Sequence, residues 1–394
     1  MFRISEPVSG FHAQPDYDPT DHGFTPVTTD EGRLRQLVEY LEEHVPAFTD
    51  TVAIPWEGTA EEVAAARSKA NDRAARMPDY IVHTSMLVLG AGVDHTLPFV
   101  AYGGSSASFS DGVVAGVAGD VPVRVFVPTE PTGAVVVAAH GGAWWMGDGT
   151  SRDGVFGPDC AALAQRSGAV VVDVDFRLAP EHPMPAAAED LAAVVRWVAA
   201  QAAAPVGERD AVLADAPVDA SKIVLWGRSS GGHSCVIAAK QLAGGDGAAP
   251  RPASVALSAP SLDLRGRSKT MLRAVFGTED ATDPAVSPAL GDVSFLDDVY
   301  VQVGTADTTV AGSPELVKKV REAGGTAELD EYLATHGVAQ PSVQRARITD
   351  LARHILAATG TERELPAEAA GEYDKDAVDR ANEEYWGPRP GAGN

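Results

Sequence analysis

The chain has 394 residues, of which 45% are hydrophobic and 22% charged, as in an ordinary globular protein with an ample core. Its formal net charge of −24, without any basic stretch, argues against a nucleic-acid partner, and its two cysteines, Cys160 and Cys235, exclude a disulfide framework. No apolar run approaches the ~20 residues of a spanning helix, and the first residues lack the pattern of a secretory signal, so we expect a cytoplasmic protein that does not enter a membrane.

The N-terminal part of the chain is predicted to be an extended arm followed by helices. Residues 1–29 are polar and rich in Pro, Asp and Thr, as in an extended segment. Within residues 30–110, the stretch LRQLVEYLEEHV places its apolar side chains on one helical face, with Asp30 as the candidate N-cap. A second helix is predicted after Thr59, which stands three residues before Glu62 as in a capping box. We expect these helices to form a cap, and packing on a sheet edge is the alternative.

Short β-rich runs alternate with amphipathic helices over residues 111–358. Near-continuous apolar strands separated by helices are typical of a mostly parallel sheet covered on both faces. Residues 260–297 interrupt the alternation with a polar, helix-poor insertion, and we interpret the acidic residues 359–394 as a loosely attached tail. The predicted strands are VPVRVFVP (121–128), AVVVAA (134–139), AVVVDV (169–174), SKIVLWG (221–227), ASVALS (253–258), DVYVQVG (298–304) and TAELDEYL (326–333).

A serine between glycines stands at a predicted strand-to-helix junction. Gly227-Arg228-Ser229-Ser230-Gly231 fits the pattern G-x-S-x-G, directly after KIVLW and directly before the helix HSCVIAAKQLA. Small neighbours are needed at such an elbow because larger side chains would clash with the strand and the helix. The junction therefore predicts that Ser229 is a nucleophile. A glycine-rich structural turn is the alternative.

A glycine-rich loop ends an earlier predicted strand. The stretch VVVAAHGGAWWMGD carries His140, Gly141, Gly142 and Ala143 at the carboxyl end of that strand. Acyl transfer needs backbone N–H groups aimed at a developing oxyanion, and such a loop can present them. A tight turn that needs glycine for its positive φ is the alternative. The elbow farther along the same predicted sheet favours the oxyanion loop.

Three histidines follow Ser229, and their positions separate a candidate base from packing residues. His336 stands in a loop beyond the last strand, where a base can hang over the carboxyl edge of the sheet. His233 lies on the elbow helix, too local to reach the serine, and is expected to pack or to lie on the helix surface. His354 lies in the amphipathic helix VQRARITDLARHILAAT and is expected at the surface.

Asp307 is the candidate acid, because it follows the strand VYVQVG at its carboxyl end. It would accept the Nδ1–H of His336, fix the tautomer and stabilise the imidazolium. Asp297 and Asp298 precede this strand, and Asp330 lies within the next strand. Glu315, which follows Asp307 in the chain, is a distant second candidate.

Four separated motifs resemble those of the hormone-sensitive-lipase-like family of α/β-hydrolases. They are HGGAWWMGD, DFRLAPEHPMPAAAED, GRSSGG and VGTAD…HG, and they occur in the family's order over roughly residues 120–358. The resemblance implies an α/β-hydrolase fold: an eight-stranded, mostly parallel sheet with helices on both faces and a helical cap. The cap would be built from the N-terminal helices and the insertion 260–297. The resemblance also implies a carboxylesterase that acts on short acyl chains without a cofactor.

Carried over position by position, the resemblance makes Ser229 the nucleophile, Asp307 the acid and His336 the base. The oxyanion donors that it implies are the backbone N–H groups of Gly142, Ala143 and Ser230.

The chain departs from the family pattern on both sides of the serine. The family usually has Asp and Ala there, where this chain has Arg228 and Ser230, and it often has a third glycine at the position of Ala143. Ala143 and Ser230 keep their N–H groups, so the oxyanion hole is expected to survive. Arg228 is either a surface residue or an anchor for a substrate carboxylate or an acidic cap segment. After Asp307, the family's usual apolar residue and second Asp are missing.

Further candidates near these motifs have simpler alternatives. Trp144 and Trp145 follow the oxyanion loop and either line the acyl or alcohol pocket or pack in the core. Cys235 has no adjacent base and is expected to be a buried small hydrophobe. No H-E-x-x-H or comparable cluster indicates a metal site.

The sequence thus predicts a serine carboxylesterase that hydrolyses small or medium acyl esters through an acyl-enzyme. An amide, formamide or lactone hydrolase with the same triad, an acyltransferase, and a non-catalytic binding protein on the same fold are the alternatives. The expected partner is a small-molecule ester, and the sequence leaves both a monomer and a homo-oligomer open.

Overall fold

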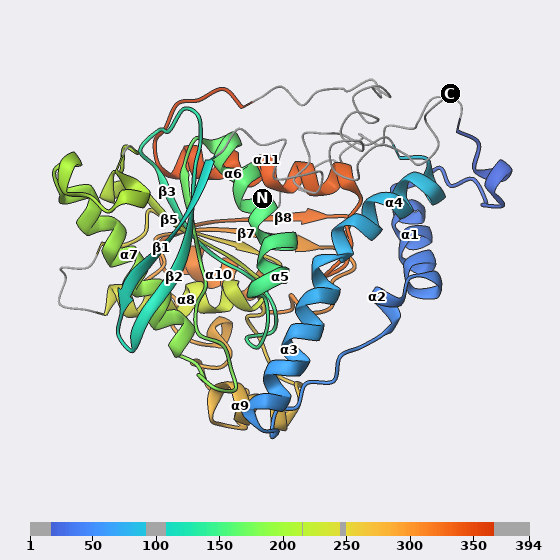
Figure 1. Ribbon diagram of the computed structural model, residues 1–394, viewed down its shortest axis with the longest axis horizontal. Helices are drawn as coiled ribbons and strands as arrows, with labels where there is room; N and C mark the ends of the chain where they lie inside the picture. Colours follow the sequence, from blue (N-terminus) through green and yellow to red (C-terminus); the bar gives the residue numbers. More distant parts are fainter. Residues whose placement is uncertain (1–16, 92–107, 215, 245–249, 366–394) are drawn as a thin grey trace, which may run out of the picture.

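A single sheet of eight strands forms the centre of the computed structural model, which describes residues 17–91, 108–214, 216–244 and 250–365 (Figure 1). The strand order is β1-β2-β4-β3-β5-β6-β7-β8. β2 pairs antiparallel with β1 and with β4, and all other neighbours are parallel, which confirms the predicted sheet. The strands are β1 (Ser108–Gly116), β2 (Gly119–Val127), β3 (Val135–Ala139), β4 (Val170–Val174), β5 (Ile223–Arg228), β6 (Ser254–Ser258), β7 (Asp298–Gly304) and β8 (Thr326–Tyr332).

Side chains along the central strands alternate between two covered faces. Val135 and Val137 belong to a buried cluster that includes α7 (Ala186–Ala203), α8 (Ser230–Ala243) and α10 (Ser313–Glu322), whereas Val136 and Ala138 belong to another that includes α6 (Gly157–Ser167) and α11 (Pro341–Ala358). Because both faces are buried, these strands are apolar at nearly every position. The helices are α1 (Asp30–His44), α2 (Pro46–Thr49), α3 (Ala60–Ala75), α4 (Met77–Leu89), α5 (Gly149–Ser151), α6 (Gly157–Ser167), α7 (Ala186–Ala203), α8 (Ser230–Ala243), α9 (Lys269–Phe276), α10 (Ser313–Glu322) and α11 (Pro341–Ala358).

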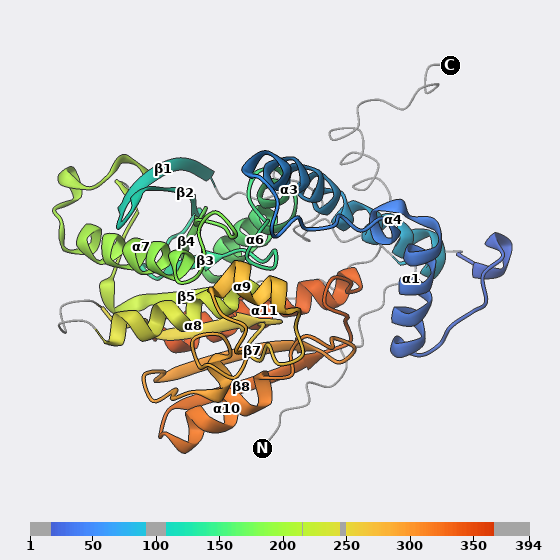
Figure 2. The same cartoon turned by 90° about the horizontal axis from the view of Figure 1, so that it is seen from below.

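The N-terminal helices lie beside the edge of the sheet toward which β7 and β8 point (blue in Figures 1 and 2). The predicted capping box of α3 is confirmed: the Thr59 hydroxyl accepts from the Glu62 N–H, and the Glu62 carboxylate accepts from the Thr59 N–H. The predicted N-cap of α1 is wrong by one residue. Thr29 caps α1 by accepting from the Gly32 N–H, and Asp30 is the first residue inside the helix.

Two elements differ from the sequence prediction. β1 was not predicted as a strand, because SFSDGVVAG is rich in Ser, Asp and Gly and lies at an edge, where side chains such as Val113 are 58% exposed. The insertion 260–297 holds one amphipathic helix, α9, whose Leu272 and Val275 are buried. Parts of the predicted arm, cap region and tail lie outside the described residues: 1–16, 92–107 and 366–394.

Arg67 on α3 ties the N-terminal helices to the rest of the molecule. Its guanidinium forms a two-bond ion pair with Glu181, at 3.0 and 2.6 Å, and also donates to the backbone carbonyls of Trp145 and Ala179. Planar Arg–carboxylate pairs of this kind are geometrically specific. Arg67 therefore helps to hold α3 in place, together with Asn71, whose amide donates to Asp148 and accepts from the Gly147 N–H.

We predict that Arg67→Met loosens α3, because methionine fills the space of the side chain but forms none of these bonds. Losing ~1.4 kcal/mol of local stability would speed amide hydrogen exchange in α3 about tenfold, with less change in the central strands. Hydrogen-exchange mass spectrometry measures this, with Lys69→Met, exposed on the same helix, as the matched control. Equal protection of α3 in the wild type and in Arg67→Met would contradict the prediction.

Candidate active site

Ser229 stands at a sharp turn between β5 and α8. Its backbone has φ 54° and ψ −118°, in the positive-φ range that L-residues rarely adopt. The glycines on either side allow the turn: a Cβ at Gly227 would lie 2.4 Å from the Gly231 carbonyl oxygen, and one at Gly231 would lie 2.3 Å from the Ala139 carbonyl oxygen. The local sequence therefore holds the serine at the strained tip of the elbow that G-x-S-x-G predicts.

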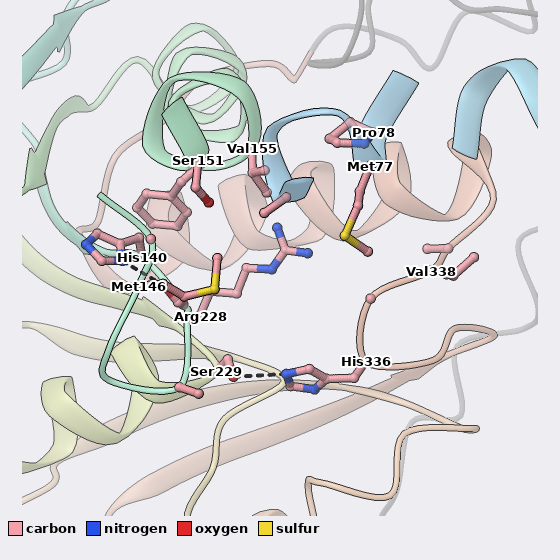
Figure 3. Close-up of a pocket in the computed structure, with 18 of the residues that line it drawn as sticks. Met77, Pro78, His140, Met146, Ser151, Val155, Arg228, Ser229, His336 and Val338 are labelled. Carbon is pink, nitrogen blue, oxygen red and sulfur yellow. Dashed lines mark hydrogen bonds between the residues drawn. The ribbon is translucent and has the colours of Figure 1, made fainter. Parts of the chain in front are cut away.

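His336 extends toward Ser229 from the loop after β8. Its Nε2 lies 2.9 Å from the Ser229 Oγ (dashed line in Figure 3). The loop is closed on itself by two bonds between Thr335 and Val338, one from each N–H. The imidazole is thus presented by a short, internally bonded turn, with its side chain 40% exposed.

Asp307 lies behind the histidine, just after β7. Its Oδ2 is 2.7 Å from the His336 Nδ1, and its side chain is buried. Burial by itself raises the pKa of this carboxyl, but the hydrogen bonds from His336 and Thr309 outweigh it and hold the pKa below its ordinary value. The structure therefore brings together the three residues that the sequence singled out, with an ionised carboxylate at one end.

Thr309 is a neighbour of this chain of groups that the sequence analysis missed. Its N–H and its hydroxyl both donate to the Asp307 Oδ1, at 2.8 and 2.7 Å, and its Oγ1 also lies 2.8 Å from the His336 Nδ1. The sequence held a signal for this contact. In an Asx turn, the Asp carboxylate accepts from the residue two positions later, and Thr309 stands at that position after Asp307. Thr309 fixes the orientation of the Asp307 carboxylate.

The glycine-rich loop after β3 passes directly beside the serine. A Cβ at Gly141 would lie 3.2 Å from the Ser229 Cβ. Gly142 has φ 128°, and a Cβ there would lie 1.9 Å from the Met146 carbonyl oxygen, so only glycine fits. Ala143 also has a positive φ, 52°.

The N–H groups of this loop are available for an additional acceptor. Within the described ranges, the backbone N–H groups of Gly142, Ala143 and Ser230 donate to no partner. Ser230 is the first residue of α8, where helix geometry leaves the N–H without an intrahelical acceptor. The three donors proposed by resemblance are therefore free to bind an oxyanion.

A cavity of ≈ 340 Å³ opens in front of Ser229 and His336. Its walls are mostly apolar side chains from α3, α4, the glycine-rich loop and the residues before α6. Arg228 borders it beside Met146 (Figure 3). The sequence left open whether Arg228 is a surface residue. It is not, because its Nη1 lies 3.2 Å from the Oδ2 of Asp159, a buried carboxyl on α6.

The two tryptophans after the oxyanion loop are core residues. Trp144 is 5% exposed and packs against Phe276 and His233 in the apolar cluster that covers α9. Trp145 is 3% exposed and contacts Trp56 edge-on. Neither lines this cavity, so the packing alternative holds for both.

The two histidines set aside as catalytic candidates are both internal. His233 is fully buried and its Nε2 lies 3.1 Å from the Val286 carbonyl oxygen, which confirms the packing alternative. The surface position expected for His354 is wrong. Its Nε2 lies 2.7 Å from the Ser254 Oγ and 3.2 Å from the Asp298 Oδ1, and its ring stacks on Tyr300, because this face of α11 packs against the sheet.

Other kinds of site find little support in the described part of the chain. Cys160 and Cys235 are both buried, and burial raises the pKa of each thiol. No group of three or more His, Cys, Asp or Glu side chains among the described residues is arranged to hold a metal ion. No helix within the described ranges combines the length and hydropathy needed to cross a bilayer.

Known proteins share this architecture and part of this sequence. A family profile described as alpha/beta hydrolase fold matches residues 136–339. Carboxylesterase NlhH of Mycobacterium tuberculosis is 40% identical over 123 residues, 31% of this chain and 34% of that protein. Esterase LipI of the same species is 36% identical over 135 residues, 33% of this chain and 38% of that protein. The chain therefore spans about a third of the length of these curated relatives.

A solved structure extends the similarity over most of the fold. Esterase LipW from Mycobacterium marinum superimposes with a TM-score of 0.57 at 26% identity, over 84% of this chain and 97% of that one.

We predict that His233 makes stability depend on pH. Burial lowers the pKa of His233 from 6.5 to about 4 in the folded protein. Between these values the unfolded chain binds a proton that the folded protein does not, so the free energy of unfolding falls as the pH falls. The contribution lost between pH 7 and pH 5 is about 2 kcal/mol. His233→Gln has no imidazole to protonate. Its free energy of unfolding, compared with that of the wild type, should therefore rise by about 2 kcal/mol when the pH falls from 7 to 5.

Urea unfolding of the wild type and His233→Gln at pH 7 and pH 5 measures the difference. His182→Gln, at an exposed position, is the control and should show no such change. A gap between wild type and His233→Gln that is the same at both pH values would rule the explanation out.

Proposed function

Because the chain belongs to the hormone-sensitive-lipase-like family of α/β-hydrolases, we propose that it is a serine hydrolase of carboxylic esters. The observation that carries the proposal is the continuous contact from the Ser229 Oγ through His336 to Asp307, at 2.9 and 2.7 Å. A serine, an imidazole and a carboxylate at these distances form a catalytic triad, in which the imidazole takes the serine proton and the carboxylate stabilises the imidazolium.

Acylation begins when Ser229 attacks the ester carbonyl. The His336 Nε2 takes the hydroxyl proton as the Oγ–carbon bond forms, and Asp307 stabilises the imidazolium through the Nδ1–H bond. The negative charge that develops on the carbonyl oxygen is bound by the free N–H groups of Gly142, Ala143 and Ser230. His336 then donates its proton to the alcohol oxygen, which leaves.

Deacylation repeats these steps with water in place of serine. His336 takes a proton from the water, whose oxygen attacks the acyl carbon, and the same N–H groups hold the second oxyanion. Collapse returns the proton to the Ser229 Oγ and releases the carboxylic acid. The reaction uses protein groups and water alone.

The cavity supports a substrate of small or medium size. Its volume of ≈ 340 Å³ lies near the lower end of small-molecule sites, and its walls are mostly apolar. We therefore propose short-chain or medium-chain acyl esters as the substrate class.

We predict that Ser229→Ala lowers kcat on p-nitrophenyl butyrate by roughly 10⁴–10⁶, because no other group replaces the nucleophile. The steady-state release of p-nitrophenol measures it. Ser234→Ala is the matched control, since this serine lies one turn along α8 and donates to the Ser230 carbonyl. Wild-type turnover in Ser229→Ala would remove Ser229 from the mechanism.

We predict that Thr309→Val slows acylation about tenfold, because the Asp307 carboxylate loses one of the bonds that orient it. The effect should fall on kcat rather than on KM, since Thr309 touches Asp307 and His336 and does not line the cavity. Thr308→Val, at an exposed position, is the control. A change in KM alone would show that Thr309 does not act through Asp307.

A further inference from the structure

Two guanidinium groups border the cavity in front of Ser229. They belong to Arg228, which immediately precedes the serine, and to Arg347 on α11. Among the described residues that line this cavity there is no Asp or Glu. A mostly apolar pocket thus carries two fixed positive charges in its wall.

Arg228 has a carboxylate partner inside the protein. Its Nη1 pairs with the Asp159 Oδ2 at 3.2 Å, and Asp159 also accepts from the Gln344 amide, at 3.2 and 3.3 Å to its two oxygens. Burial raises the pKa of Asp159, against the opposing effect of Arg228. Even a fully ionised Asp159 supplies a single negative charge to this wall.

Arg347 is buried, and no carboxylate of the described residues forms an ion pair with it. The residue is 6% exposed, and the contact of its guanidinium within the described ranges is with the Tyr332 ring, 5.9 Å from the ring centroid. Burial, and to a lesser degree the charge of Arg228, lowers the pKa of Arg347, but a guanidinium remains protonated at neutral pH. A desolvated cation of this kind is costly unless an anion binds it.

The other carboxylate near Arg347 is already engaged. The charges of Asp159 and then of Asp307 oppose the lowering of the Arg347 pKa, but the two oxygens of Asp307 bond His336 and Thr309 and form no ion pair with Arg347. Asp159 pairs with Arg228, so Arg347 is left without an ion pair of its own among the described residues. A carboxylate in the cavity would supply the missing partner.

We propose that the cavity selects an ester that also carries a free carboxylate, with Arg347 as the main anchor and Arg228 beside it. A carboxylate matches the planar fork of a guanidinium and forms short, charge-assisted bonds with it. The inference rests on the proposed ester hydrolysis, and it adds the chemical class of the substrate. The carboxylate belongs either to the acyl part or to the alcohol part of the ester.

Paired substrates test the two placements. Monomethyl glutarate against methyl pentanoate places the carboxylate in the acyl part, and 4-acetoxybenzoate against its neutral methyl ester places it in the alcohol part. We expect kcat/KM for the anionic ester to exceed that of its neutral partner by roughly tenfold or more in one pair, the scale of a bond to a buried charge. Equal or lower values for the anionic ester in both pairs would overturn the inference.

Variants connect the preference to Arg347. Arg347→Met should lower the anionic-to-neutral ratio of kcat/KM about tenfold, and Arg347→Lys, which keeps the charge but not the fork, should restore it in part. Arg353→Met is the matched control, because Arg353 lies on the same helix, is 58% exposed and pairs with Asp350. Should Arg347→Met fail to fold, Arg228→Gln is tested in the same way and should also lower the anionic-to-neutral ratio of kcat/KM. A fall that is equal for both esters would show a structural role and overturn the inference.

Calorimetric titration with the monoamide of glutarate, a monoanion, and with 4-hydroxybenzoate separates this inference from the proposed function. Binding that Arg347→Met abolishes, in a protein that hydrolyses none of the four esters, would support the anion site and overturn ester hydrolysis. Hydrolysis of the neutral esters without binding or preference for either anion would overturn the anion site alone. The absence of both would overturn the two together.

Discussion

The site depends on one constraint: parallel strands bring their carboxyl ends to the same edge of a sheet. β5, β7 and β8 lie in one parallel set, so the residues that follow them meet above that edge. Ser229 and His336 are in hydrogen-bond distance although 107 positions separate them in the chain. The loop after β3 obeys the same rule and lies against Ser229 at Gly141. Short loops are sufficient because the sheet has already brought the ends together.

Close packing around the elbow offsets the strain that positions the serine. A non-glycine residue at positive φ, such as Ser229 or Ala143, costs of order 1–3 kcal/mol, and it persists only where the surrounding structure imposes it. Here α8 packs against β5 and β3 at Gly227 and Gly231, so closely that a Cβ on either glycine would clash with a backbone carbonyl oxygen. The buried core of the sheet thus supports the geometry that points the Ser229 hydroxyl at His336.

The sequence predicted the features that local patterns encode and missed those made by distant contacts. The elbow was predictable because its glycines, strand and helix are contiguous, and Asp307 because it follows a recognisable strand. The ion pair of Arg228 was not, since Asp159 stands far along the chain on a helix whose relative position depends on the whole fold. The same holds for His354, which a helical pattern places at the surface but the sheet buries. β1 was missed because an edge strand needs few apolar residues.

Trapping with a fluorophosphonate tests most directly whether His336 activates Ser229. We would incubate the wild type and His336→Gln with the reagent and locate the adduct by peptide mass spectrometry. We predict a single phosphonyl group on the peptide that contains Ser229, forming roughly 10³-fold more slowly in His336→Gln. An adduct on another residue, or equal rates in the two proteins, would contradict the assignment of a serine activated by that imidazole.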